Sequence, residues 1–321
     1  MRHSALTLAQ QVNERVASGQ SWDVLFCSDM LPLAEFCGLV SPDVARLPRI
    51  FYFHENQLTY PSRTNLERDH HFAFTNFVSA AAADQVWFNS AFHRDAFLSA
   101  MEDFLRRMPD FAPMAHLNSI RAASHIHSPG VPDHPPRNER KPGPLRILWA
   151  ARWEHDKGPD DFFEALRRLR ESHNFELFVL GESFDDSPTV FQTARELFAA
   201  EIRQWGFVKE QADFFNILRT ADVIVSTATH EFFGIAVAEA IAAGTIPVVP
   251  RRLAYPEVIS EIDHSQCMYD GSVDDLVAKL QYWCRMAEAD DIPPSLTETI
   301  QASVARYLWP QRASEMDDAV A

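Results

Sequence analysis

The chain has 321 residues, of which 46% are hydrophobic and 23% charged, and 45 acidic against 29 basic residues give it a net charge of −16 at pH 7. This size and apolar content suit a soluble protein of two ordinary domains, and no apolar run reaches the roughly 18 residues of a membrane span. The acidic balance argues against a protein whose main task is to hold nucleic acid through its phosphates.

The cysteine pattern bounds the cellular setting. Cys27, Cys37, Cys267 and Cys284 are scattered in apolar surroundings and form no C-x-x-C pair. Neither a disulfide framework nor a zinc knuckle is therefore expected. The first residues also lack the long apolar region of a signal peptide. We expect a cytoplasmic protein.

Residues 1–128 alternate predicted helices with predicted strands. Apolar residues at helical spacing predict a helix over residues 5–18, and short apolar runs predict buried strands. The predicted strands are Trp22–Cys27, Arg49–His54 and Gln85–Ser90, and further helices are predicted over Leu33–Phe36, from Glu67 to Ala83 and from the last strand through Arg106. The alternation predicts a parallel sheet with helices on both faces.

A proline-rich segment separates this region from a second alternation. Residues 129–144 hold six of the 20 prolines and predict an extended linker. Beyond it, residues 145–294 are predicted to form a second domain, and residues 295–321 to form helices that cross back to the first. The predicted strands are Leu145–Ala150, Phe175–Gly181, Ala221–Ser226 and Thr245–Val249, and the predicted helices are Pro159–Arg170, Thr189–Ala200 and Gly234–Ala243.

Two carboxylates stand out in the second domain. The helix predicted over Gly234–Ala243 is almost wholly Ala, Ile and Val, yet it carries Glu239. A charge there is costly unless it is paired or hydrogen-bonded. Glu231 lies in the turn before the helix, where backbone N–H groups favour anions. A bound ligand with phosphates and hydroxyls accounts for both acids. The alternative is that Glu231 caps the helix and Glu239 meets an internal arginine.

A second polar cluster follows a strand of the first domain. The run His54-Glu55-Asn56-Gln57 comes directly after the predicted strand Arg49–His54. Ligands of open α/β sheets bind at the carboxyl ends of the strands, so this run predicts a binding site. The alternative is a polar turn that caps the sheet.

The Glu231–Glu239 pair resembles the E-x7-E signature of retaining glycosyltransferases of the GT-B fold, family 4 type, because it lies in a strand–turn–helix–Gly–strand setting. The resemblance implies two doubly wound domains. It also implies that Glu239 holds the ribose hydroxyls of a nucleotide-sugar donor. Further donor contacts would come from Glu231, Phe232, Phe233, Gly234 and Ile235, and from Phe207 and Val208 at the nucleobase.

The loop after the strand Leu145–Ala150 strengthens the resemblance. Arg152 and Lys157 match the G-R-x-x-x-x-K-G loop of GT-B transferases, with Ala151 in place of the usual Gly. The diphosphate leaving group gains negative charge as the glycosidic bond breaks, and fixed cations stabilise that state. The chain has no D-x-D, so no metal or other cofactor is expected. The alternative for this pair is a solvated surface loop.

The run Y-F-H-E-N-Q-x-x-Y-P over residues 52–61 resembles the tRNA-queuosine α-mannosyltransferase family more specifically. Members of that family transfer mannose from GDP-mannose to queuosine in the tRNA anticodon. The resemblance implies that His54 faces the donor sugar and that Glu55, Asn56 and Gln57 lie on the acceptor side. Together the two resemblances imply a retaining, metal-independent transferase in which the departing phosphate takes the acceptor proton. Members of the family begin with a strand and a glycine-containing turn, whereas this chain starts at the helix near Leu6, so the resemblance leads us to expect an incomplete N-terminal domain.

Transfer RNA as a partner of an acidic protein requires a local basic patch. We expect Arg251, Arg252 and the cluster Arg137–Lys141 to supply it. Two other functions remain open: a GT-B transferase that acts on a glycan or small metabolite, and a non-catalytic nucleotide- or nucleic-acid-binding relative. The oligomeric state is not predicted.

Overall fold

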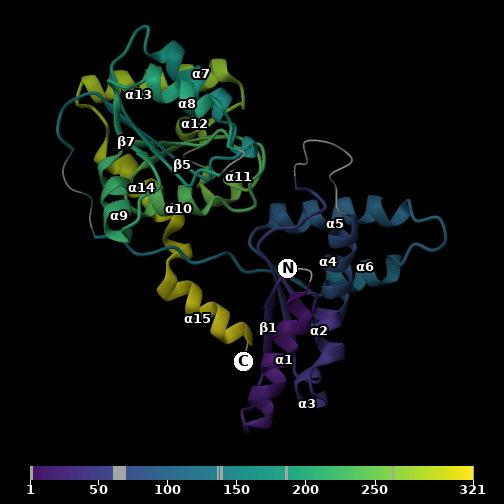
Figure 1. Ribbon diagram of the computed structural model, residues 1–321. Coiled ribbons are helices and arrows are strands. Elements are labelled where there is room, and N and C mark those ends of the chain that lie inside the picture. The colour runs from purple at the N-terminus through teal and green to yellow at the C-terminus, as the bar shows by residue number, and fades with distance from the viewer. Residues whose placement is uncertain are drawn as a thin grey trace. The chain divides into compact units, whose positions relative to one another are not determined.

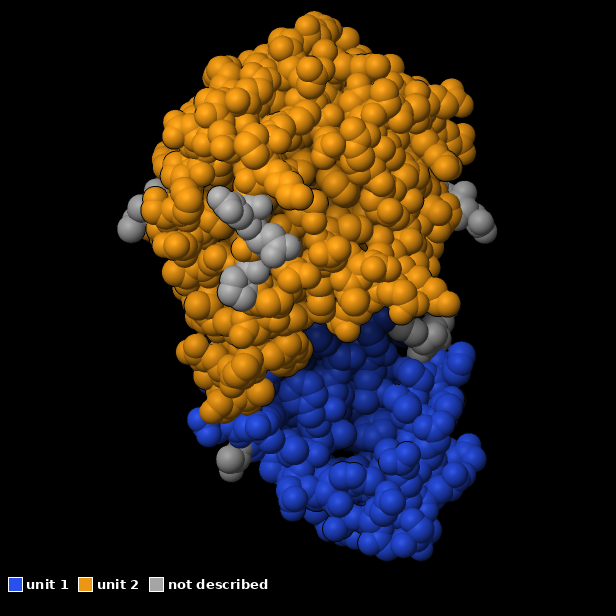
Figure 2. Space-filling model, turned by 90° about the vertical axis from the view of Figure 1, so that its left-hand side faces the viewer, with its two compact units in different colours: residues 1–128, 316–321 blue, residues 129–315 orange. Residues whose placement is uncertain are grey.

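The computed structural model describes residues 3–60, 70–135, 137, 140–184, 187–261 and 264–320 (Figure 1). The chain forms two compact units, which Figure 2 colours separately. Unit 1 comprises residues 1–128 and 316–321, and unit 2 comprises residues 129–315. The proline-rich segment 129–144 thus belongs to unit 2, as does most of the C-terminal tail.

Unit 1 is built on a parallel sheet with the strand order β1-β2-β3-β4 among its described residues. The strands are β1 (Leu25–Ser28), β2 (Arg49–Phe53), β3 (Gln85–Phe88) and β4 (Ser124–Ile126). The helices are α1 (Ser4–Ala17), α2 (Leu33–Leu39), α3 (Pro42–Ala45), α4 (His70–Ala82), α5 (Ala91–Arg106) and α6 (Met114–Ala122). The first residues of the helix predicted from Glu67 lie outside the described residues. Phe51, Phe53 and Phe88 are fully buried against the helices on one face of the sheet.

The other face of this sheet carries a smaller apolar cluster. Ile50, Tyr52 and Trp87 are buried there, and the end of the C-terminal helix α15 (Trp309–Val320) packs on them through Met316. The chain end therefore belongs to the same compact unit as the first 128 residues.

The described strands of unit 2 form a six-stranded parallel sheet in the order β10-β9-β8-β5-β6-β7. The strands are β5 (Leu145–Ala150), β6 (Phe175–Leu180), β7 (Ile202–Gly206), β8 (Val223–Val225), β9 (Ile246–Pro250) and β10 (Met268–Tyr269). Counted from β5, this is the order 3-2-1-4-5-6 of dinucleotide-binding sheets, read from β7. The order reverses between β5 and β8, and in such sheets the ligand binds beside the carboxyl ends of the two strands at that point.

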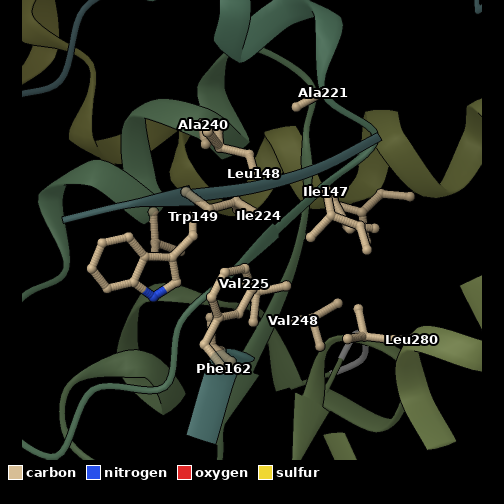
Figure 3. Packing of buried hydrophobic residues seen from close by; sticks show 14 of the residues in the cluster. Ile147, Leu148, Trp149, Phe162, Ala221, Ile224, Val225, Ala240, Val248 and Leu280 are labelled. Carbon is tan, nitrogen blue, oxygen red and sulfur yellow. The ribbon is translucent and has the colours of Figure 1, made fainter. Parts of the chain in front are cut away.

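Helices cover both faces of this sheet. They are α7 (Pro159–Leu169), α8 (Val190–Leu197), α9 (Gln211–Thr220), α10 (Ile235–Ala242), α11 (Tyr255–Val258), α12 (His264–Cys267), α13 (Val273–Glu288) and α14 (Pro294–Val304). Figure 3 shows Leu148 lying toward Ala240 of α10, while Trp149 and Val225 lie toward Phe162 of α7. Because the strands are apolar on both faces, they read as continuous hydrophobic runs.

Comparison with the sequence predictions separates strong signals from weak ones. The predicted strand Leu145–Ala150 is confirmed to the residue as β5, and the predicted two-domain parallel α/β class is confirmed. Short or weakly periodic elements were missed, among them α6, β4 and β7. Strand β4 has three residues, and its outer side chains are partly exposed, so it carries no buried apolar run.

A buried ion cluster ties the proline-rich segment to the sheet of unit 2. Asp222, whose side chain is 1% exposed, lies 2.8 Å from Arg137 and 3.1 Å from both Arg140 and Arg146. The expectation that Arg137 and Arg140 supply a basic patch is therefore wrong, because their side chains are 15% and 13% exposed and bound to Asp222. Pro136, Asn138 and Glu139 lie outside the described residues.

This cluster generates a prediction about stability. Replacing Asp222 with Ala leaves three arginines without their shared anion, and removing one partner of a buried ion pair costs about 3–5 kcal/mol. We expect Asp222→Ala to lower the free energy of unfolding by that amount in urea titrations. Asp274→Ala serves as control, because Asp274 is 87% exposed beside Arg168. A small, equal effect of both substitutions would contradict this account.

Candidate active site

Two loops meet at the reversal point of the unit 2 sheet. One follows β5 and the other follows β8, and hydrogen bonds from two threonines of the second loop join it to the backbone of the first. The Thr229 backbone N–H and Oγ1 donate to Asp156 O at 2.8 and 3.1 Å, and Thr227 Oγ1 donates to Lys157 O at 2.9 Å. Gly158 allows this approach: its φ is +62°, and a Cβ there would lie 2.3 Å from Thr227 O. The chemistry-bearing residues of both loops are thus held on one small framework.

Lys157 is the buried cation of this framework. Its Nζ lies 3.1 Å from Asp156 Oδ2 and 3.5 Å from Glu231 Oε2, and it donates to His230 O at 3.0 Å. Burial alone lowers the pKa of Lys157, but the nearby Glu231 and Asp156 outweigh burial and raise that pKa above its usual value. Lys157 therefore stays charged at neutral pH.

The charge of Arg152 acts on Lys157, but the Arg152 side chain reaches solvent. Its side chain is 46% exposed, and its Nη2 is 3.5 Å from Glu154. Burial lowers the pKa of His230 to about 4, and the charges of Lys157 and Arg152 act in the same direction. His230 is therefore neutral at pH 7, while two cations stand close to it. This is a setting in which an anionic ligand is stabilised.

Glu231 begins the turn that leads into α10. Its Oε1 accepts from the Phe232 N–H at 3.1 Å and the Phe233 N–H at 3.5 Å, so part of the carboxylate does cap the turn. Gly234 follows with φ +85°, and a Cβ there would come within 2.8 Å of the Tyr255 ring. The Tyr255 hydroxyl in turn lies 2.6 Å from Ser226 Oγ. Packing of the Tyr255 ring against Gly234 thus fixes the turn.

Glu239 behaves differently from Glu231. It is partly buried on α10, and burial raises its pKa to about 7. No side chain among the described residues forms a hydrogen bond or an ion pair with its carboxylate, so the internal arginine of the alternative interpretation is not found there. A half-buried carboxylate in this state is costly to the unliganded protein. It suits a ligand that donates hydroxyl hydrogens.

The remaining predicted donor residues fall into two groups. Phe232 and Phe233 are buried, at 4% and 3% exposure, so their side chains support the turn and their backbone borders it. Ile235 and Phe207 are 47% and 67% exposed. Phe207 and the partly buried Val208 follow the end of β7, so Phe207 presents an open aromatic ring at the carboxyl edge of the sheet.

The polar run after β2 is arranged as a tight loop in unit 1. Exposed His54 lies above Tyr52, with ring centroids 4.5 Å apart, and its carbonyl accepts from Asn89 Nδ2 at 2.9 Å. Burial lowers the pKa of His54, against the raising effect of Glu55. Asn56 is fully buried, and its Oδ1 accepts from the N–H and Oγ1 of Thr59, so it shapes the loop. Partly buried Glu55 and exposed Gln57 flank Asn56.

Comparison with known proteins places the chain in a family. Residues 1–131 match the model of the tRNA-queuosine alpha-mannosyltransferase N-terminal domain, and residues 131–292 match that of group 1 glycosyl transferases. The chain is 35% identical over 298 residues to the tRNA-queuosine alpha-mannosyltransferase of Drosophila melanogaster, an alignment that covers 89% of this chain and 76% of that protein. The chain belongs to the tRNA-queuosine alpha-mannosyltransferase family. It is a glycosyltransferase, as its sequence resemblance implied.

More distant relatives extend this assignment. The GDP-mannose:cellobiosyl-diphosphopolyprenol alpha-mannosyltransferase of Xanthomonas campestris is 24% identical over 275 residues, covering 84% of this chain and 71% of that protein. Sucrose-phosphate synthase from Thermosynechococcus elongatus matches in structure with a TM-score of 0.71 at 14% identity, covering 99% of this chain and 78% of that one. Such neighbours confirm the GT-B fold of this family member.

Several polar residues near the two sites were not predicted from the sequence, although a sequence signal existed for some of them. Asp29 follows β1 as His54 follows β2, so the strand-end rule applied to His54 also selects Asp29. Asp156 and His230 lie within the motifs but gained their importance from contacts that only folding creates. Among the described residues no group of three His, Cys, Asp or Glu side chains is arranged to hold a metal ion.

His125 and His127 belong to no such group of metal-binding side chains among the described residues. The rings lie 6.4 Å apart, and His127 stacks on Trp87 with centroids 3.8 Å apart. The Tyr52 hydroxyl donates to His127 O at 2.6 Å. These contacts make His127 a packing residue.

No helix in the described part of the chain is long and apolar enough to cross a membrane.

The state of Glu239 generates a prediction about pH. The pKa of Glu239 in the folded protein, about 7, is raised above its unfolded value, so protonation of Glu239 favours the folded state. Its favourable contribution to the free energy of unfolding is complete below about pH 4.5 and is lost as pH rises through 7. We expect Glu239→Gln to stabilise the unliganded protein by about 1–3 kcal/mol at pH 8 and to change little near pH 4.5.

Thermal unfolding at both pH values measures this difference. Glu298→Gln is the matched control, because Glu298 is exposed on α14. A less stable Glu239→Gln protein at pH 8 would mean that the carboxylate has a favourable partner in the unliganded fold.

Proposed function

We propose that this protein transfers mannose from GDP-mannose to queuosine in a tRNA anticodon, with retention at the sugar carbon and without a metal ion. The observation that carries the proposal is the 35% identity with a tRNA-queuosine alpha-mannosyltransferase along 89% of this chain. The name of the Xanthomonas relative, a GDP-mannose-dependent enzyme, supports the donor. The name of the Drosophila relative, a tRNA-queuosine alpha-mannosyltransferase, supports the acceptor. A tRNA substrate further leads us to propose the cytoplasm as the site of action.

The donor is assigned from the charges of the unit 2 site. Lys157 and Arg152 take the diphosphate, because they are the cations of the framework at the sheet reversal point. Glu239 takes the ribose hydroxyls, since its carboxylate has unused acceptor capacity. Exposed Phe207 stacks on the base. Glu231 and the backbone of the Phe232–Ile235 turn border the sugar and the diphosphate.

The proposed reaction balances without a protein nucleophile. The bond between the sugar C1 and the β-phosphate oxygen breaks while the acceptor hydroxyl oxygen bonds to C1 from the same face. The hydroxyl proton passes to the departing phosphate oxygen, and GDP leaves. Lys157 and Arg152 stabilise the charge that develops on the diphosphate. His54, at the end of β2, faces the transferred sugar, with Glu55 and Gln57 on the acceptor side.

Binding of tRNA by an acidic chain depends on where its positive charges are free. The side chain of Arg252 is partly committed, because Nε donates to Ala228 O at 3.2 Å. Arg251 is exposed. We therefore assign the phosphate contact to Arg251 rather than to the buried arginines around Asp222. Such contacts make binding fall steeply as salt rises.

The diphosphate assignment predicts the effect of two substitutions. Arg152→Ala and Lys157→Ala should each lower turnover by about 10²-fold or more, because each removes fixed charge from the transition state. Arg195→Ala on α8 serves as the matched control and should change turnover little. A chelator should have no effect on the wild-type enzyme. Strong inhibition by the chelator would contradict the metal-independent mechanism.

The complete function is tested by incubating the protein with GDP-mannose or another nucleotide sugar and with tRNA that contains or lacks queuosine. We expect mannose transfer to the queuosine-containing tRNA alone, detected as a mass increase of the modified nucleoside. Transfer to a glycan or a small metabolite, with none to either tRNA, would reject the tRNA acceptor and keep the glycosyltransferase. Binding of GDP-mannose without transfer to any acceptor would favour a non-catalytic relative.

A further inference from the structure

A small cavity opens in unit 1 at the carboxyl ends of β1 and β2. Its volume is about 110 Å³. A cavity needs only about 10–15 Å³ on the same measure to hold one water molecule, so this cavity has room for a larger ligand. Polar groups line one part of it and apolar groups the rest. Its polar residues are Asp29, Gln57, Thr75 and Asn76, and its apolar wall includes Met30 and Phe72.

The polar part of the cavity is rich in hydrogen-bond acceptors. Asn76 is 5% exposed, and its Oδ1 has no hydrogen-bond partner among the described residues, while its Nδ2 donates to Asp29 O at 3.2 Å. A buried carbonyl oxygen without a partner is costly in the empty protein. It therefore points to a ligand that donates a hydrogen bond.

Asp29 is held rigidly beside this oxygen. Its backbone N–H donates to Tyr52 O at 3.0 Å, and its Oδ1 accepts from the His54 N–H at 3.1 Å. Burial raises the pKa of Asp29 to about 6, against hydrogen bonds from the backbone. The carboxylate is thus mostly ionised at pH 7 but poorly hydrated, a state in which a hydroxyl donor binds well.

We propose that this cavity is the acceptor subsite, where Asp29 and Asn76 accept hydrogen bonds from a vicinal diol on a five-membered ring. The inference rests on the proposed function, since queuosine carries a cyclopentene ring with two adjacent hydroxyls. Two fixed acceptors hold two adjacent hydroxyls before the reaction, and the hydroxyl that attacks C1 exchanges its hydrogen bond to the cavity for one to the departing phosphate oxygen as the bond to C1 breaks. Met30 and Phe72 offer an apolar surface to the ring carbons. Gln57 lies at the same cavity and belongs to the polar run after β2.

The cavity distinguishes this ligand from a nucleotide phosphate. None of the described residues that line it is Lys, Arg or His, and the carboxylate of Asp29 repels an anion. A nucleobase, with its several ring N–H and carbonyl groups, would leave part of its edge unmatched by an acceptor-rich wall. A neutral diol makes good use of both Asp29 and Asn76.

Substitution of Asp29 by Asn tests the subsite, because it removes the charge and keeps an oxygen for the His54 N–H. We expect Asp29→Asn to raise KM for queuosine-containing tRNA by about tenfold or more, with a smaller effect on kcat. The Kd for GDP-mannose and the melting temperature should stay as in the wild-type protein. Asp43→Asn is the matched control, since the Asp43 side chain is 89% exposed in the same unit.

A second variant and a direct binding measurement complete the test. Asn76→Ala should weaken binding of the free queuosine nucleoside in calorimetry, as Asp29→Asn should, because it removes the second acceptor. Unchanged KM and nucleoside affinity in both variants, with transfer by the wild-type protein, would overturn this inference and leave the proposed function intact. A loss of melting temperature with equal losses in kcat and donor affinity would also overturn it, by showing a structural role. Failure of the wild-type protein itself to modify queuosine-containing tRNA would instead reject the proposed function and, with it, this ligand.

Discussion

The donor half of this glycosyltransferase depends on the junction between the loops after β5 and β8. Hydrogen bonds from Thr227 and Thr229 to the backbone of Asp156 and Lys157 hold the loops together, and Gly158 makes the approach possible. This junction lies where the strand order reverses. The parallel sheet fixes the ends of both strands, so groups some 70 residues apart in the chain are brought within one hydrogen-bonding network.

The two glutamates of the E-x7-E pattern differ in the partners that their carboxylates have in the unliganded protein. Glu231 is satisfied within the unliganded fold, because it caps its own turn and lies near Lys157. Glu239 is left with a raised pKa and no described partner. On the proposed assignment, the bound donor relieves the electrostatic cost that the fold carries at Glu239, which is a common way for a binding site to be prepared in advance.

Unit 1 presents a similar arrangement with weaker charges. The loop after β2 is organised by a buried amide, and the residue after β1 is held by backbone hydrogen bonds. The result is a small cavity with fixed acceptors and no cation among the described residues of its lining. Unit 2 gathers cations for a diphosphate, whereas the unit 1 cavity gathers oxygen atoms. This difference in chemistry matches the proposed division between donor and acceptor.

Several parts of this protein follow from the sequence by itself. Largely apolar runs such as Leu145–Ala150, in which Arg146 is the one polar residue, identify buried parallel strands, because a strand covered on both faces needs no polar alternation. The alternation of strands and helices determined the fold class. The spacing of Glu231 and Glu239 around Gly234, with the run after β2, identified the family, and the same pair is the basis of the proposed donor site.

The tertiary structure alone decided which charges are available. The cluster Arg137 and Arg140 resembles a basic patch in the sequence, but Asp222, which directly precedes strand β8 more than 80 residues away, neutralises it. Asp29 and Asn76 lie 47 residues apart and carry no joint pattern, yet the sheet and α4 place them at one cavity. Local sequence patterns report periodicity and backbone preference. Partners for a charge are chosen by long-range packing, which no local pattern encodes.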